Sequence, residues 1–235
     1  MPDKHLSTQF DNELSGISSR VLEMGGLVEA QVAQAVYALS EFSGETASQV
    51  IRQEERVNQM EIEIDRDLSA IIARRQPTAR DLRLLIAVSK TIANLERVGD
   101  EAARIARTVE RLMNSGLSNH LRLPMSDLQF EAGLATNLLR QALDAFARLD
   151  AVQALEVIKG DNQIDAEFDG LMRKLVTYMM EDPRTISASI DLVFVAKAIE
   201  RVGDHAKNLA EQVIYIVKGA DVRHTSVEGV QSVVS

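Results

Sequence analysis

Hydrophobic residues recur along most of the chain at the three- and four-residue spacing of amphipathic helices. Between residues 45 and 74 they form a seam, a row of positions that faces neighbouring helices and repeats every seven residues. Its members are Val50, Val57, Ile64 and Ile71, with Leu68 at the alternate position. The pattern predicts six long helices, over residues 8–42, 45–74, 78–115, 126–149, 151–181 and 185–218.

Residues that start and stop helices flank these segments. Pro77 and Pro183 stand just before the third and sixth segments, while Gly116 and Gly219 follow their last periodic residues. From Ala220 onward the periodicity is lost, and we expect a frayed tail.

The chain contains an internal repeat. Residues 34–57 align with residues 141–164 at an offset of 107, and after a three-residue deletion the offset becomes 104. At that offset the pentapeptide Glu-Arg-Val-Gly-Asp at 96–100 recurs unchanged at 200–204. The sequence therefore predicts an all-α fold built from two copies of one three-helix unit, at residues 1–116 and 126–219. A linker at 117–125 joins them, and the tail covers 220–235.

Composition narrows the class of protein. Hydrophobic residues make up 46% of the chain but aromatic residues only 4%, which is typical of helical bundles. There is no Cys, so we expect a reducing compartment, the cytoplasm. No apolar run approaches the roughly 20 residues that a membrane helix needs, and no signal peptide is expected. The net charge of −9 argues against nucleic acid as a partner and favours cations or basic protein surfaces.

Acidic residues occupy seam positions of the second helix in each copy. Glu54 and Glu61 stand where the seam would otherwise hold leucine. In the second copy Asp161 takes the place of Glu54, and Asp165 follows one turn later on the same face.

The repeated pentapeptide adds acids on the third helix of each copy. Glu96 and Asp100, like Glu200 and Asp204, are four residues apart and so lie one above the other on the helix. Gly99 and Gly203 lie between them, although glycine inside a helix costs about 1 kcal/mol relative to alanine. We expect a close approach of another helix or of a ligand beside these acids.

Carboxylates held close together repel one another unless they are protonated, paired with cations or bound to metal. Oxygen ligands with almost no histidine suit divalent or iron cations, singly or in a carboxylate-bridged cluster. The alternative is neutralisation by salt bridges, for which the candidates are Arg97, Arg201, Lys90 and Lys197. We expect His205 at the surface or beside a ligand, because the first copy has Glu101 at its position, and the other three histidines in solvent.

No catalytic motif is present. The sequence lacks the Glu-x-x-His pairs of di-iron bundles, a P-loop, a nucleophile elbow and a zincin motif. We therefore assign no catalytic residue and expect no enzymatic activity. The rival interpretation is a metal-dependent enzyme or a metal store that uses the same carboxylates.

Several motifs together resemble the PhoU family of accessory proteins of bacterial phosphate-specific transport. They are Met24-Gly25-Gly26, Arg75-Gln76-Pro77-Thr78-Ala79, Asp81-Leu82-Arg83, both Glu-Arg-Val-Gly-Asp segments, Asp144-Ala145-Phe146-Ala147-Arg148 and Tyr178-Met179-Met180-Glu181-Asp182. The likeness covers about residues 5–225. It implies two tandem, pseudo-symmetric three-helix bundles and acidic motifs that hold metal ions.

The resemblance also implies a function. Members of the family are negative regulators of phosphate uptake and of the phosphate-starvation response. They relay the state of the phosphate ABC transporter, through its ATPase subunit, to a membrane sensor histidine kinase. They are peripheral cytoplasmic proteins, frequently homodimers, without insertion into the membrane.

The family's metal motif carries over residue by residue, with one departure. Asn58 stands in the first copy where the second copy has Asp165, and an amide is a poorer ligand than a carboxylate. We therefore expect the second copy to hold metal better than the first. Ala147 and Arg148 are candidate contacts with a signalling partner; the alternative is an arginine that complements the helix dipole.

Overall fold

The computed structural model describes residues 8–114 and 124–235. Within these ranges the chain forms helices and no strands, which confirms the all-α prediction. The helices are α1 (Thr8–Glu41), α2 (Gly44–Arg75), α3 (Ala79–Asn114), α4 (Met125–Arg148), α5 (Ala151–Glu181), the 3-10 turn η1 (Pro183–Thr185), α6 (Ile186–Lys218) and α7 (Val227–Val234). All six predicted helices are present, with ends that differ from the prediction by a few residues at most.

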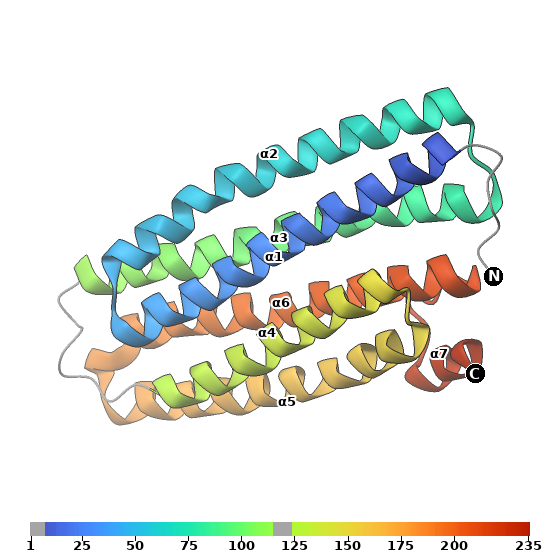
Figure 1. The fold of residues 1–235 in the computed structure, drawn as a ribbon. Helices are drawn as coiled ribbons and strands as arrows, with labels where there is room; N and C mark the ends of the chain where they lie inside the picture. The colour runs from blue at the N-terminus through green and yellow to red at the C-terminus, as the bar shows by residue number, and fades with distance from the viewer. Residues whose placement is uncertain (1–7, 115–123) are drawn as a thin grey trace.

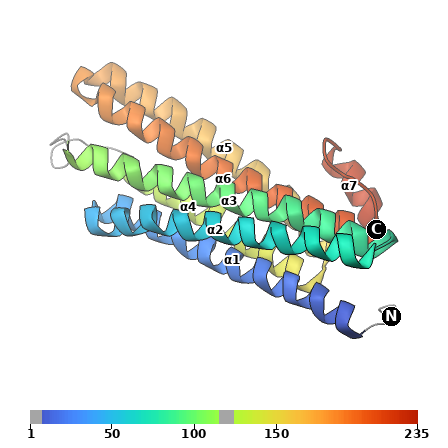
Figure 2. The ribbon, with the colours of Figure 1, turned by 90° about the horizontal axis from the view of Figure 1, so that it is seen from above.

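The long helices form two three-helix bundles that lie side by side (Figure 1). Helices α1, α2 and α3 make one bundle and α4, α5 and α6 the other. Helix α3 packs along α6 through the centre of the molecule, and α1 packs against α4 (Figure 2). The repeat predicted from the sequence is thus a structural repeat whose two copies bury one face against each other.

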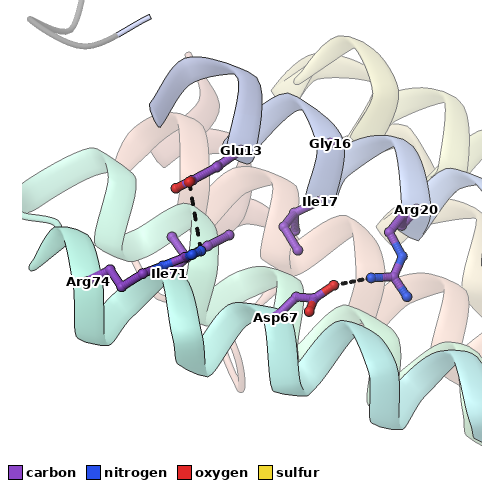
Figure 3. A pocket seen from close by; sticks show the side chains of 7 residues that line it. All are labelled: Glu13, Gly16, Ile17, Arg20, Asp67, Ile71 and Arg74. Atoms are coloured by element: carbon purple, nitrogen blue, oxygen red, sulfur yellow. Dashed lines mark hydrogen bonds and ion pairs between the residues drawn. The ribbon is translucent and has the colours of Figure 1, made fainter. Parts of the chain in front are cut away.

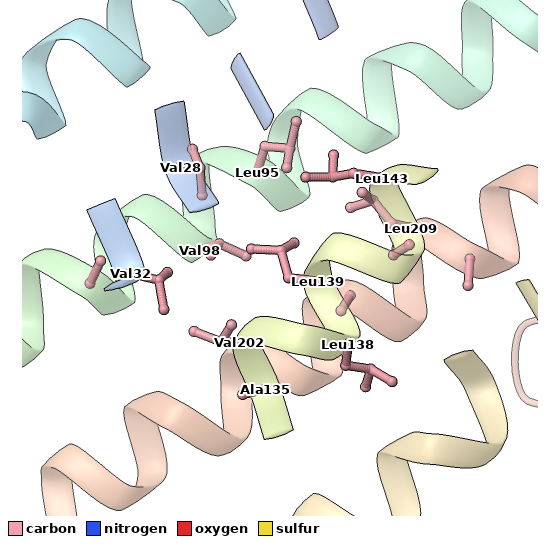
Figure 4. Close-up of a cluster of buried hydrophobic side chains, with 14 of the residues drawn as sticks. Val28, Val32, Leu95, Val98, Ala135, Leu138, Leu139, Leu143, Val202 and Leu209 are labelled. Atoms are coloured by element: carbon pink, nitrogen blue, oxygen red, sulfur yellow. The ribbon is translucent and has the colours of Figure 1, made fainter. Parts of the chain in front are cut away.

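A continuous hydrophobic core runs through both bundles. Figure 4 shows Val28 and Val98 of the first bundle facing Leu139 and Val202 of the second. All four side chains are buried. Gly25 of α1 lies so close to α4 that a Cβ there would come within 2.4 Å of Leu143. The two units therefore share apolar packing and are not joined by a chain segment alone.

Local chemistry explains where the helices begin and end. The side chain of Ser43 accepts a hydrogen bond from the backbone N–H of Thr46 at the start of α2. Asp150 caps α5 in the same way. Gly219 ends α6 with φ 74°, a conformation that favours glycine, as the sequence predicted. Gly116 falls outside the described residues.

The prediction of a frayed C-terminal tail is wrong for residues 227–234. Helix α7 forms there, capped by the Ser226 side chain, and packs against α5 and α6. Val230 and Val234 are buried, as is Val222 before the helix. Eight residues are too few to show a clear period, but the spacing of these valines places them on one face, and burial of that face orders the segment.

The linker predicted at 117–125 falls mostly outside the described residues. Its last residue, Met125, is already the first residue of α4. No helix in the described ranges is both long enough and apolar enough to cross a membrane.

Candidate functional site

The packing of α2 on α3 brings the predicted acids of the first copy together. We call this group the α2–α3 cluster, formed by Glu54, Glu61, Glu96 and Asp100. Burial raises the pKa of Glu54, Glu61 and Glu96 above the ordinary value, and the negative charge of Asp100 adds to each shift. The sequence predicted this meeting correctly.

Few cations oppose the α2–α3 cluster. Arg107 forms an ion pair with Glu54, and Arg97 acts on Glu61 and Glu96 only at longer range. Among the described residues, Glu61, Glu96 and Asp100 form no ion pair within 4.0 Å. Asn58 lies half-buried on the same helix as Glu54, and its Oδ1 has no hydrogen-bond partner in the structure.

The second copy forms an equivalent group with different neighbours. The α5–α6 cluster consists of Asp161, Asp165, Glu200 and Asp204. Lys207 donates a hydrogen bond of 2.7 Å to Asp161, whose side chain is only 2% exposed. Lys197 lies 2.5 Å from Glu200. Burial raises the pKa of Asp165 and of Asp204, and the other acids of the cluster contribute to both shifts.

The structure separates the four predicted counter-ions. Only Lys197 pairs with an acid of its cluster. Arg201 reaches across to Glu101 on α3, at 2.9 Å, and Lys90 lies over the ring of Tyr215.

Two cations that do oppose the clusters, Arg107 and Lys207, were missed by the sequence prediction. Lys207 lies three residues after Asp204 and so on the same side of the helix. This spacing could have identified it as a candidate counter-ion.

The residues present meet only part of what a metal needs. In residues 8–114 and 124–235 no three His, Cys, Asp or Glu side chains are grouped so that they could hold a metal ion. The oxygen donors of the α2–α3 cluster suit a hard cation, and three of its carboxylates have no close counter-ion. In the α5–α6 cluster two ammonium groups each take one carboxylate oxygen, Oδ2 of Asp161 and Oε1 of Glu200. Metal binding stays a prediction.

His205 lies in the interface between α3 and α6. Its Nδ1 is 3.0 Å from Oδ1 of Asn94. Burial, together with the positive charges of Arg97 and Arg201, lowers the pKa of His205 to about 4. It is therefore a neutral interface residue and not a surface one. His224 is exposed as expected, and the remaining two histidines lie outside the described residues.

The glycines of the pentapeptide allow a close helix approach. A Cβ on Gly99 would lie 3.2 Å from Oε1 of Gln31 and 3.3 Å from Cγ1 of Val57, and both of these side chains are buried. A Cβ on Gly203 would come within 2.7 Å of Ile164. The expected close approach is thus to other helices of the same bundle.

We predict that Gly99→Ala destabilises the chain by about 1 kcal/mol, since crowding against Val57 and Gln31 outweighs the better helix propensity of alanine. Gly170→Ala is the matched control, because no atom lies within 4 Å of its Cβ position. This change should stabilise the chain by up to about 1 kcal/mol. Urea unfolding of both variants tests the difference, and equal effects would contradict it.

Glu131 is a buried acid that the sequence analysis did not single out. It lies on α4, is 0% exposed, and neither carboxylate oxygen has a hydrogen-bond partner in the structure. Burial raises its pKa to about 8, with the negative charges of Glu200 and Glu167 adding to the shift. At the aligned position, 107 residues earlier, the first copy has Met24. An acid in one copy at a position where the other copy has an apolar residue is the signal that could have identified Glu131 from the sequence.

One open cavity lies between α1 and α2, away from both clusters (Figure 3). Its volume is about 430 Å³, and Glu13, Arg20, Asp67 and Arg74 line it together with Ile17 and Ile71. Arg20 is paired with Asp67, and Glu13 is paired with Arg74 and with the neighbouring Arg75. Its charges therefore already satisfy one another.

Ala147 and Arg148, the predicted partner contacts, are the last two residues of α4, and both are exposed. Arg148 forms an ion pair of 3.5 Å with Asp144 one turn earlier. Leu149 then ends the helix in the left-handed conformation, with φ 51°. The pair is accessible, and its role as a contact stays a prediction.

Comparison with known proteins tests the resemblance. The family described as "PhoU domain" matches residues 21–109 and again 131–213, one match on each bundle. The chain belongs to the PhoU family. A phosphate-specific transport system accessory protein PhoU homolog of a Burkholderia species is 49% identical over 228 residues, which cover 97% of each chain.

Solved PhoU structures also match this fold. The crystal structure of PhoU from Pseudomonas aeruginosa has a TM-score of 0.86 and 44% identity, over 90% of this chain and 100% of that one. The phosphate transport system regulatory protein PhoU from Streptococcus pneumoniae has a TM-score of 0.83 at 28% identity, over 91% of this chain and 99% of that one. The PhoU fold of two three-helix bundles is therefore that of the chain.

Proposed function

We propose that this chain is a negative regulator of phosphate uptake and of the phosphate-starvation response. It acts in the cytoplasm as a non-enzymatic adaptor that relays the state of a phosphate ABC transporter, through its ATPase subunit, to a membrane sensor histidine kinase. The observation that supports this most is the near full-length match to a phosphate-specific transport system accessory protein. The acidic surface of the chain, with a net charge of −9, suits basic partner surfaces.

The exposed end of α4 is our candidate for one of these contacts. Arg148 has a side chain that is 66% exposed, so another protein can reach it without any change in the bundle. Binding of the purified chain to the transporter ATPase and to the kinase can be measured by cross-linking and by titration. We expect Arg148→Ala to weaken one of the two complexes by roughly tenfold, which corresponds to about 1.4 kcal/mol. Arg173→Ala, an exposed arginine of α5, is the control.

Deletion of the gene tests the function as a whole. In the deletion strain a phosphate-responsive reporter should be expressed even when phosphate is plentiful, and the wild-type chain supplied in trans should restore repression. Normal repression in the deletion strain would refute the proposal and leave the rival, a metal-dependent enzyme or metal store. The deletion strain complemented with Arg148→Ala then shows whether the α4 contact is part of the relay.

A further inference from the structure

The two lysines of the α5–α6 cluster hold its most buried acids. Nζ of Lys207 lies 2.7 Å from Oδ2 of Asp161, and Nζ of Lys197 lies 2.5 Å from Oε1 of Glu200. The acids are 2% and 11% exposed as side chains, whereas the lysines are 34% and 46% exposed. Each lysine therefore pairs with a carboxylate that is more buried than the lysine itself.

Each lysine has a second interaction that favours a positive charge at its position. Burial by itself would lower the pKa of Lys207, but its hydrogen bond to Asp161 and the negative charges of Asp204 and Asp165 outweigh burial and raise it. Lys197 lies 5.2 Å from the centroid of the Phe168 ring, at which distance the ring face attracts an ammonium group. Four carboxylates thus face two fixed positive charges.

The first copy has neither lysine. At the offset of 104, Lys197 aligns with Ala93 and Lys207 aligns with Ala103. The arginine that pairs with Glu54, Arg107, aligns in turn with Glu211. The two clusters therefore share the acids of the pentapeptide and the pair Glu54 and Asp161 by duplication, but the cations that form ion pairs with them differ.

We propose that Lys197 and Lys207 are permanent counter-ions of the α5–α6 cluster and exclude divalent cations from it. A metal ion bound by Oδ2 of Asp161 or by Oε1 of Glu200 would have to displace an ammonium group, and a metal ion elsewhere in the cluster would be repelled by both lysines. This reverses the expectation, based on Asn58, that the second copy holds metal better than the first. The inference concerns binding by the isolated chain and does not depend on the regulatory function proposed above.

Replacing each lysine by the alanine of the first copy tests the proposal. The full chain and the double variant Lys197→Ala/Lys207→Ala are titrated with Mn²⁺ alone, and free Mn²⁺ is counted by electron paramagnetic resonance. We expect the variant to bind one Mn²⁺ per chain more than the wild type, whatever number the wild type binds. Its unfolding temperature should fall without metal and recover when Mn²⁺ is added.

A lysine outside the cluster serves as the matched control. Lys174 pairs with Asp127 at 2.7 Å in the same bundle, so Lys174→Ala also removes a salt bridge but should leave Mn²⁺ binding at the wild-type number. If the alanine variant does not fold, as judged by circular dichroism, Lys197→Gln/Lys207→Gln keeps the side-chain stems and removes only the charges.

Two results would overturn the proposal. The first is a folded double variant that binds no more Mn²⁺ than the wild type. The second is a wild-type chain that loses a bound Mn²⁺ when Asp161→Asn and Asp204→Asn are introduced, because that metal must then have been held in the α5–α6 cluster.

Discussion

Glu131→Met should stabilise the chain, and most strongly at alkaline pH. The buried carboxyl has no hydrogen-bond partner in the structure and a pKa raised to about 8, mainly by burial, from an ordinary value of 4.5. Each pKa unit corresponds to about 1.4 kcal/mol, so above pH 8 the ionised form destabilises the folded state by on the order of 5 kcal/mol. Methionine is the residue that the first copy has at this position, where Met24 is fully buried.

The direction of the pH dependence follows from proton binding. Between about pH 4.5 and pH 8 the folded chain keeps the proton on Glu131 and the unfolded chain releases it. The protonated carboxyl therefore makes its full contribution to the free energy of unfolding below pH 4.5. This contribution is lost as the pH rises toward 8.

Urea unfolding of wild type and variant at pH 5, 7 and 8.5 measures the effect. We expect the gain of Glu131→Met to grow with pH, and Glu131→Gln to reproduce the trend because it removes only the charge. Glu156→Gln is the control, since Glu156 is exposed on α5 and paired with Lys159. A gain that is the same at all three pH values would contradict a raised pKa at Glu131.

Arg201→Ala should lower the free energy of unfolding by about 3 kcal/mol. This value is near the lower end of the losses found when one partner of a buried ion pair is removed. Glu101 is almost fully buried on α3, and Arg201 reaches it from α6 at 2.9 Å. Without Arg201 the carboxylate keeps only Arg104, at 3.3 Å and half exposed. Because the Arg201 side chain is itself 45% exposed, solvent screens its charge. We therefore expect the loss of stability to be smaller than the largest losses seen for fully buried ion pairs.

The repeat supplies the control for this prediction. Arg97 stands at the same position of the same pentapeptide, but it forms no ion pair within 4.0 Å among the described residues. Arg97→Ala should therefore change the free energy of unfolding by less than about 1 kcal/mol. Thermal and urea unfolding compare the two variants, and equal losses would show that the pair between Glu101 and Arg201 is not what holds this part of the interface.

Much of the fold could be predicted from sequence because its determinants are local. The seven-residue repeat of Val50, Val57, Ile64 and Ile71 placed all four side chains on the buried face of α2, and each is buried. Asp150 begins α5 and Gly219 ends α6, each through hydrogen bonds to residues a few positions away in the chain. Helix α7 was missed since its order comes from packing on α5 and α6, which its short sequence does not reveal.

The candidate site was predictable only in part, because some of its contacts are local and others depend on tertiary packing. Periodicity identifies the face of a helix that is buried, and so it brought the acids of α2 and α3 together correctly. It does not identify the helix that covers that face. Lys207 lies 46 residues from Asp161, and Arg201 lies 100 residues from Glu101.

By itself, the sequence determined the six long helices, the duplication and the helix faces on which the acids lie, because helix periodicity and repeated residues are properties of the chain. Apart from Lys197, which the sequence named as a counter-ion, the tertiary structure alone decided which cation meets which carboxylate, and that the Glu131 side chain has no hydrogen-bond partner. Duplicated helices place equivalent acids in equivalent positions, but the charges around them come from whichever residues the packing of α3 on α6 and of α5 on α6 brings near.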